Sequence, residues 1–136
     1  MRHWMLDTNV LSDAIRSPQG VVARRIEAVG QSNVSISVVV AAELRFGVEN
    51  SGSDRSRRQV DAVLSSIEIM PLAEPVDREY GVLRAALKRH GSPIGPNDLL
   101  IAAHALARGA VLVTANRGEF SRVDGLALEN WLDTGG

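Results

Sequence analysis

Residues 94–105, with the sequence IGPNDLLIAAHA, decide the fold class of this 136-residue chain. A Gly-Pro pair near the start of this stretch breaks the preceding helical pattern, and Asn97 is suited to cap a helix over residues 98–108. A glycine then ends that helix, and the apolar run 111–114 follows at once as a strand. This direct passage from helix to strand predicts a parallel α/β arrangement.

The same alternation extends outward in both directions. Apolar runs that predict strands lie at residues 3–6, 34–37, 67–72, 111–114 and 126–132. Helical spacing predicts helices at residues 22–29, 38–48, 60–67, 76–90 and 98–108. We therefore expect one α/β domain over residues 1–136, with a central parallel sheet of four to five strands and helices on both faces.

Local signals predict where some of these helices begin and end. Ser12 is expected to cap a short helical turn after the first strand, and Ser37 is expected to cap the helix that starts at Val38. Gly30 is suited to end the second helix. The polar stretch 50–53 is expected to form a loop.

Composition limits the classes of function that remain. Hydrophobic residues make up 45% of the chain but aromatic residues only 4%, so the core is expected to be aliphatic. The absence of cysteine excludes disulfides, thiolate metal sites and a cysteine nucleophile. Since no apolar run approaches the roughly 20 residues that span a bilayer, we expect a cytoplasmic protein without a membrane segment.

The chain is nearly neutral, but its basic residues are almost all arginines. The net charge is −1, so no overall field attracts nucleic acid. Lys88 is the only lysine among 15 basic residues, and the rest are arginines. Arginine suits bidentate contacts to phosphate, although a GC-rich genome would favour arginine codons without any such role. Both interpretations remain open at this stage.

Acidic and amide residues recur where an apolar run gives way to a turn or helix. The positions concerned are Asp7, Glu43, Asp98, Asn116 and Glu119. In a parallel sheet such positions fall on one edge, so side chains far apart in the sequence converge there. Clustered carboxylates repel one another unless a cation lies among them, and hard divalent cations prefer oxygen ligands. The pattern therefore indicates a magnesium-type site.

Each of these residues also has a simpler structural explanation. An aspartate after a strand, such as Asp7, is often a turn former or a helix cap. Glu43 lies among apolar residues, where a carboxylate needs a metal or an ion pair, for example with Arg45. Asp98 would be favoured in the first turn of its helix by the helix dipole alone. Their joint order on one expected edge favours the functional interpretation.

Four segments carry a family resemblance that covers nearly the whole chain in order. Residues 6–12, 35–47, 94–105 and 112–120 resemble the PIN-domain ribonucleases and, more narrowly, the VapC-type toxins with their FitB-like relatives. The resemblance implies that Asp7, Glu43 and Asp98 hold Mg²⁺, with Mn²⁺ as a possible substitute. It leaves open whether Asn116 or Glu119 fills the family's variable fourth position.

The resemblance also implies supporting residues. The side chains expected to orient the carboxylates by hydrogen bonds are those of Thr8, Asn9 and Thr114. Apart from the resemblance, the arginines expected to hold the RNA backbone are Arg45, Arg84 and Arg117, since they lie close in sequence to site elements or on the adjoining helix. None of the three histidines is expected to take part, and His104 is expected to face a neighbouring element or solvent.

The implied function is that of a metal-dependent endoribonuclease toxin. Its reaction is hydrolysis of RNA to 5′-phosphate and 3′-hydroxyl products, and its expected partners are a VapB-like antitoxin and a second copy of the chain in a homodimer. The alternative is a catalytically silent PIN domain that binds RNA or an antitoxin. An aspartyl-phosphate enzyme is disfavoured, since Asn9 stands where such folds need a second aspartate.

Overall fold

Five parallel strands form the centre of the molecule. The computed structural model describes residues 2–132, and its sheet has the strand order β3-β2-β1-β4-β5. The strands are β1 (Trp4–Leu6), β2 (Val34–Ser37), β3 (Glu68–Met70), β4 (Val111–Val113) and β5 (Leu128–Glu129). The predicted α/β class is confirmed. The expected domain span of 1–136 includes residue 1 and residues 133–136, which lie outside the described residues.

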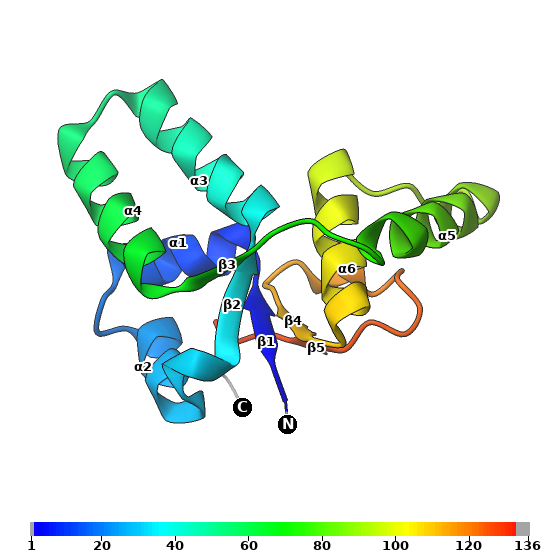
Figure 1. Cartoon of the computed structure of the whole chain (residues 1–136), viewed down its shortest axis with the longest axis horizontal. Coiled ribbons are helices and arrows are strands. Elements are labelled where there is room, and N and C mark those ends of the chain that lie inside the picture. The colour runs from blue at the N-terminus through cyan, green and yellow to red at the C-terminus, as the bar shows by residue number, and fades with distance from the viewer. Residues whose placement is uncertain (1, 133–136) are drawn as a thin grey trace.

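Helices cover both faces of this sheet. They are α1 (Thr8–Arg16), α2 (Val21–Val29), α3 (Val38–Ser51), α4 (Asp54–Ser66), α5 (Val76–Arg89), α6 (Pro96–Arg108) and the short α7 (Arg117–Phe120), with a 3-10 turn η1 (Gln31–Asn33). Figure 1 shows α1 to α4 on one side of the strands and α5 and α6 on the other. Within residues 2–132 no helix combines the length and the apolar composition that crossing a bilayer requires.

The start of α1 differs from the prediction. Asp7 caps this helix by accepting a hydrogen bond from the Val10 backbone N–H at 3.0 Å, and Ser12 lies inside the helix. The predicted Ser12 cap is therefore wrong. An aspartate one residue after the strand satisfies the first free N–H groups, so the helix begins almost at once.

Two other element boundaries differ from the prediction. The helix α6 begins at Pro96 with Gly95 as its cap, so Asn97 lies in the first turn and is not the cap that was predicted. Proline suits this position because it lacks an N–H that would otherwise be unpaired. The predicted loop 50–53 is reduced to Gly52 and Ser53, since α3 continues through Ser51 and ends where Gly52 adopts a left-handed φ of 65°.

The strand register places the functional edge. Leu6 pairs with Val113, and the Asp7 N–H donates to the Val113 carbonyl at 3.0 Å. Asp7 and Thr114 therefore leave adjacent central strands side by side. The strands beneath them are aliphatic and almost fully buried, as Leu6, Leu112 and Val113 illustrate. This packing fixes the carboxyl edge of the sheet, where polar side chains accumulate.

Candidate active site

Asp7 lies at the base of the polar cluster. Its side chain is 5% exposed and accepts hydrogen bonds from the Val10 N–H and the Thr114 hydroxyl. Burial raises the pKa of Asp7 above its ordinary value, with a further contribution from the charge of Glu43, although the hydrogen bonds act against this. Asp7 is thus both a helix cap and a desolvated carboxylate directed at the cluster.

Glu43 reaches the same region from α3. Its Oε1 accepts a 2.5 Å hydrogen bond from the Thr8 hydroxyl, and its Oε2 lies 3.5 Å from the Asn97 amide nitrogen, which donates to it. Among the described residues Glu43 forms no ion pair, and Arg45 pairs instead with Asp61. The simpler explanation of Glu43 as the partner of Arg45 is therefore wrong. Glu43 links α3 to the starts of α1 and α6.

Asp98 projects from the first turn of α6 and is half-buried. Burial raises the pKa of Asp98 to about 6, and the negative charges of Glu119, Glu43 and Asp7 add to this effect. These three carboxylates belong to α7, to α3 and to the residue before α1, so segments far apart in the sequence act on Asp98.

The stretch after β4 has a defined geometry. Asn116 caps α7, its side-chain amide donates to Glu119 Oε2 at 2.8 Å, and its backbone N–H donates to the Thr114 hydroxyl at 2.9 Å. The other carboxylate oxygen of Glu119 accepts from the Gly95 N–H at 2.9 Å. The Glu119 carboxylate therefore links α7 to the start of α6, near Asp98, and the Asn116 amide donates to it.

The donor set is suited to a hard divalent cation. The charges of Glu119, Glu43 and Asp7 raise the pKa of Asp98, and the charge of Glu43 raises that of Asp7, so a divalent cation among these oxygens would favour the ionised forms of Asp7 and Asp98. Within residues 2–132 no group of three or more acidic or histidine side chains already surrounds one point at ligand distance. The side chains would therefore rotate inward to bind one ion together, while Thr8, Thr114 and Asn97 limit that movement.

A shallow groove extends from the carboxylates along α3. Its volume is about 690 Å³, and it is lined by Thr8, Val38, Val39, Ala42, Glu43, Phe46, Asn97 and Leu100. Phe46 is 69% exposed, which is uncommon for a large apolar side chain. The groove thus joins an acidic end at Glu43 to an apolar end at Phe46. Sequence reasoning identified neither Phe46 nor the contact of Asn97 with Glu43.

The predicted supporting residues have different environments. Thr8 and Thr114 donate to Glu43 and Asp7 as expected. Asn9 is exposed, and it affects Asp7 through its backbone N–H. His104 is fully buried in α6, where its Nδ1 lies 2.8 Å from the Ser37 hydroxyl. It therefore faces a neighbouring element, not solvent, and has no contact with the carboxylates.

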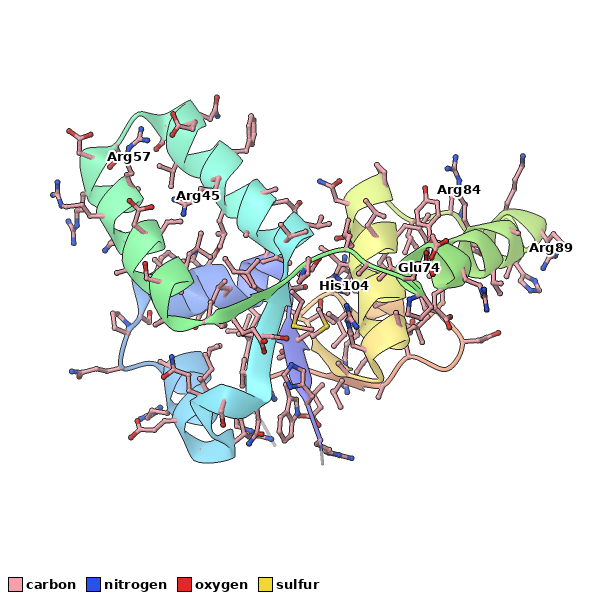
Figure 2. All side chains as sticks on the ribbon, viewed as in Figure 1. Arg45, Arg57, Glu74, Arg84, Arg89 and His104 are labelled. Carbon is pink, nitrogen blue, oxygen red and sulfur yellow. The ribbon has the colours of Figure 1, made fainter. Side chains whose placement is uncertain are left out.

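The three predicted RNA-binding arginines are not brought together. Arg45 lies between α3 and α4 in an ion pair with Asp61, whereas Arg84 extends from α5 on the far side of the sheet (Figure 2). Arg84 donates to the Tyr80 hydroxyl at 2.9 Å. Arg117 is exposed at the start of α7, one residue after Asn116. In the sequence Arg117 follows Asn116 directly, and Arg45 lies two residues after Glu43.

The fold and this acidic edge define a known class of domain. A sequence profile of the PIN domain matches residues 4–126. The chain is also 41% identical over 130 residues to the Rickettsia felis ribonuclease VapC2, covering 94% of this chain and 97% of the relative. It is 36% identical over 132 residues to the tRNA(fMet)-specific endonuclease VapC of Shigella flexneri, and this match covers 96% of this chain and 99% of the relative.

Solved structures agree with these relatives. The VapBC2 complex of Rickettsia felis, bound to a DNA fragment from its promoter, contains a chain that matches with a TM-score of 0.85 and 40% identity over 94% of this chain and 98% of that one. A chain of FitAcB from Neisseria gonorrhoeae matches with a TM-score of 0.82 and 28% identity, and the match covers 95% of this chain and 98% of that one. The chain therefore belongs to the PIN-domain family and, within it, to the VapC ribonucleases.

Proposed function

We propose that this chain is a metal-dependent endoribonuclease toxin that is neutralised by a VapB-like antitoxin. The observation that carries the proposal is the convergence of Asp7, Glu43, Asp98 and Glu119 at the carboxyl edge of the sheet. The VapC relatives that this chain matches over nearly its whole length are named as nucleases, which supports a hydrolase that cuts RNA. The substrate RNA would lie across this edge.

The proposed ion is Mg²⁺, for which Mn²⁺ can substitute. When bound, such an ion lowers the pKa of water and neutralises charge on phosphoryl oxygens. Asp7, Glu43 and Asp98 are the proposed ligands. We assign the fourth position to Glu119 and a positioning role to Asn116, because Glu119 acts on Asp98 as a charge and Asn116 donates to Glu119.

The protein's own groups would orient this centre. Thr114 and the start of α1 fix Asp7, while Thr8 and Asn97 fix the two oxygens of Glu43. These hydrogen bonds limit the positions that the carboxylates can take, so that with an ion bound their charge would be directed at the phosphodiester site. No part of this arrangement uses the 2′-hydroxyl of RNA, so the expected products carry 5′-phosphate and 3′-hydroxyl ends.

The proposed partners follow from the complexes of the relatives. Matching chains occur in VapBC complexes of Rickettsia felis and Salmonella typhimurium and in FitAcB of Neisseria gonorrhoeae. We extend that mode of assembly to this chain and expect a heteromer with its antitoxin. A homodimer of the toxin is proposed in addition.

Cleavage of total RNA by the purified, antitoxin-free chain tests the proposed function. We expect discrete cuts in Mg²⁺ that disappear in EDTA and fall about a hundredfold or more in Asp98→Asn, because the substitution removes the most strongly coupled carboxylate. Asp124→Asn, which changes an exposed aspartate outside the cluster, is the matched control and should cut like the wild type.

Two results would oppose the proposal. A folded, antitoxin-free wild type that cuts nothing in Mg²⁺ would favour the silent RNA- or antitoxin-binding module. Cutting that persists both in EDTA and in Asp98→Asn would mean that the acidic cluster is not the catalytic centre.

A further inference from the structure

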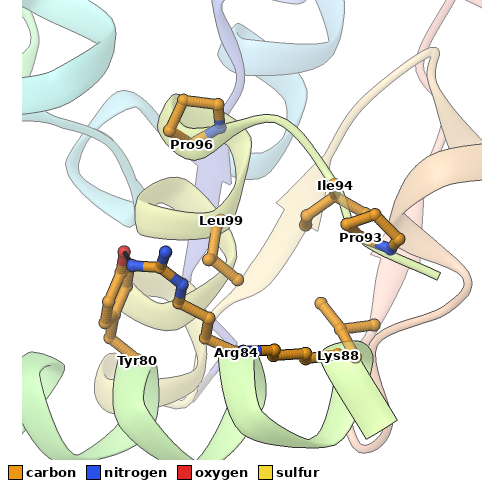
Figure 3. A pocket seen from close by; sticks show the side chains of 8 residues that line it. Tyr80, Arg84, Lys88, Pro93, Ile94, Pro96 and Leu99 are labelled. Atoms are coloured by element: carbon orange, nitrogen blue, oxygen red, sulfur yellow. Dashed lines mark hydrogen bonds between the residues drawn. The ribbon is translucent and has the colours of Figure 1, made fainter. Parts of the chain in front are cut away.

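A second cavity lies beside the acidic cluster, between α5 and the start of α6. Its volume is about 580 Å³, within the range of small-ligand sites. The residues that line it are Tyr80, Arg84, Leu87, Lys88, Pro93, Ile94, Pro96 and Leu99. Figure 3 shows Arg84 directed at Tyr80 and Lys88 lying along α5, with Pro93 and Ile94 of the loop before α6 on the opposite side.

The charge of this cavity is positive and uncompensated. Arg84 and Lys88 lie four residues apart on one face of α5, and no acidic residue lines the cavity with them. Neither cation forms an ion pair within residues 2–132, whereas Arg45 and Arg57 are paired with Asp61 and Glu49. An anion that enters the cavity therefore meets two cations without having to displace a carboxylate.

The walls of the cavity offer flat and apolar surfaces. Leu87 and Leu99 form a buried floor, each 5% exposed. The Arg84 guanidinium lies 5.9 Å from the centre of the Tyr80 ring and donates to the Tyr80 hydroxyl, so the two planar groups form one end of the cavity. Aromatic rings and guanidinium planes are the surfaces on which unpaired nucleobases stack.

The cavity lies next to the segment that carries Asp98. Pro96 and Leu99 line it, whereas Asp98, which lies between them in the sequence of the first turn of α6, does not. The adjoining Gly95 N–H donates to Glu119. An RNA strand whose phosphodiester lies at the carboxylates would therefore reach the cavity with a neighbouring nucleotide.

We propose that this cavity binds one nucleotide of single-stranded RNA next to the cleaved phosphodiester. Arg84 and Lys88 hold its phosphate, and its base lies on the apolar floor against Tyr80. This inference rests on the proposed ribonuclease function and adds to it a defined binding subsite. The combination of two free cations with a flat apolar wall fits a nucleotide better than a wholly apolar peptide segment.

The test compares two double variants of α5. Arg84→Gln/Lys88→Gln removes the cations of the cavity, and Arg78→Gln/Arg89→Gln removes two exposed cations of the same helix that do not line it. Both variants change the net charge equally, and melting temperatures verify their folding. The probe is a short, fluorescein-labelled, mixed-sequence single-stranded oligoribonucleotide, whose anisotropy is measured over a salt series with the Asp98→Asn background in Mg²⁺.

We expect the cavity variant to bind this RNA about tenfold more weakly. The slope of the logarithm of the binding constant against the logarithm of the salt concentration should become shallower by about 0.7 for each lost phosphate contact. The control variant should change affinity by about twofold or less. In the active background, KM should rise in the cavity variant while kcat at saturating RNA stays near that of the wild type, because the subsite binds but does not react.

Other outcomes would overturn the subsite. Equal losses in the two variants would indicate general electrostatic attraction, and no loss in either would mean that the cavity does not bind RNA. A loss of affinity for the antitoxin, with RNA binding unchanged, would make it a protein-binding site. Failure of the ribonuclease function itself is distinguishable, since it would appear as a wild type that does not cut in Mg²⁺.

Discussion

Single residues in this molecule combine a structural role with a place in the proposed active site. Asp7 caps α1 and is also the most buried carboxylate of the cluster, and Asn116 caps α7 while its amide donates to Glu119. The cap explanation and the functional explanation of Asp7 are therefore not alternatives. A helix start directs N–H groups and a capping carboxylate to the same point, so a metal site at a sheet edge can use the capping residue as a ligand.

Asp98 should make the metal-free chain less stable as pH rises. Its pKa is raised from 3.8 to about 6, so the folded state binds the proton more tightly than the unfolded state, and stability falls between about pH 4 and pH 6. In EDTA, Asp98→Asn should unfold at the same denaturant concentration as the wild type near pH 4. Above pH 7 it should be more stable by about 1–2 kcal/mol.

Urea unfolding at several pH values measures this difference. The exposed Asp124→Asn is the control and should follow the wild type at every pH. A difference between Asp98→Asn and the wild type that does not grow with pH would show that the carboxylates do not repel one another in the folded chain.

Substitutions of Glu119 and Asn116 should have different effects, the first on the pKa of Asp98 and on stability, the second on the rate of cleavage. Glu119→Gln removes a charge that acts on Asp98, so in EDTA the pKa of Asp98 should fall and the variant should resist unfolding better above pH 6. Asn116→Ala keeps that charge and should lose about 10–100-fold in cleavage through loss of orientation. Cleavage rates and NMR titration of the Asp98 carboxyl measure both. Cleavage at the wild-type rate by Glu119→Gln would mean that Glu119 does not fill the fourth position of the site.

At the scale of elements, the sequence predicted the order of strands and helices and the Ser37 cap of α3, but not the starts of α1 and α6. Ser12 and Asn97 had the composition of caps, yet Asp7 and Gly95 cap those helices. The cap of α1 lies five residues before the predicted one and the cap of α6 two residues before, because the sheet register and Pro96 fix where the chain turns. Boundaries decided by tertiary contacts cannot be deduced from nearby residues alone.

The start of α3 should be sensitive to one hydroxyl group. Ser37 is buried, accepts from the Val39 N–H at 3.1 Å and lies 2.8 Å from His104 Nδ1. Ser37→Ala removes the cap and also leaves a buried imidazole nitrogen without this partner, so we expect a loss of about 2–4 kcal/mol of folding free energy.

Ser53→Ala provides the matched comparison. Ser53 caps α4 through a 3.1 Å bond from the Ser56 N–H, but it lies nearer the surface and has no histidine partner. Its loss should be about 1 kcal/mol. Equal effects of the two substitutions in chemical denaturation would mean that the contact between Ser37 and His104 does not stabilise the core.

For the whole molecule, the convergence of distant acids could be predicted because parallel strands share one carboxyl edge. The four acids are spread over more than a hundred residues of sequence, from Asp7 to Glu119. In the folded chain the charges of the other three raise the pKa of Asp98. The cavity with Arg84 and Lys88 could not be predicted in the same way. It depends on how α5 packs against α6, which no periodicity in the sequence specifies.

The chemical identity of the RNA ends tests the central claim most directly. The purified chain would be incubated with RNA in Mg²⁺, and the new ends would be assayed for 5′-phosphate and for 3′-hydroxyl groups. Hydrolysis at the acidic cluster predicts both groups at every cut, without any cyclic phosphate. Products that carry 2′,3′-cyclic phosphate and 5′-hydroxyl ends would contradict the account, because they require attack by the 2′-hydroxyl of the RNA.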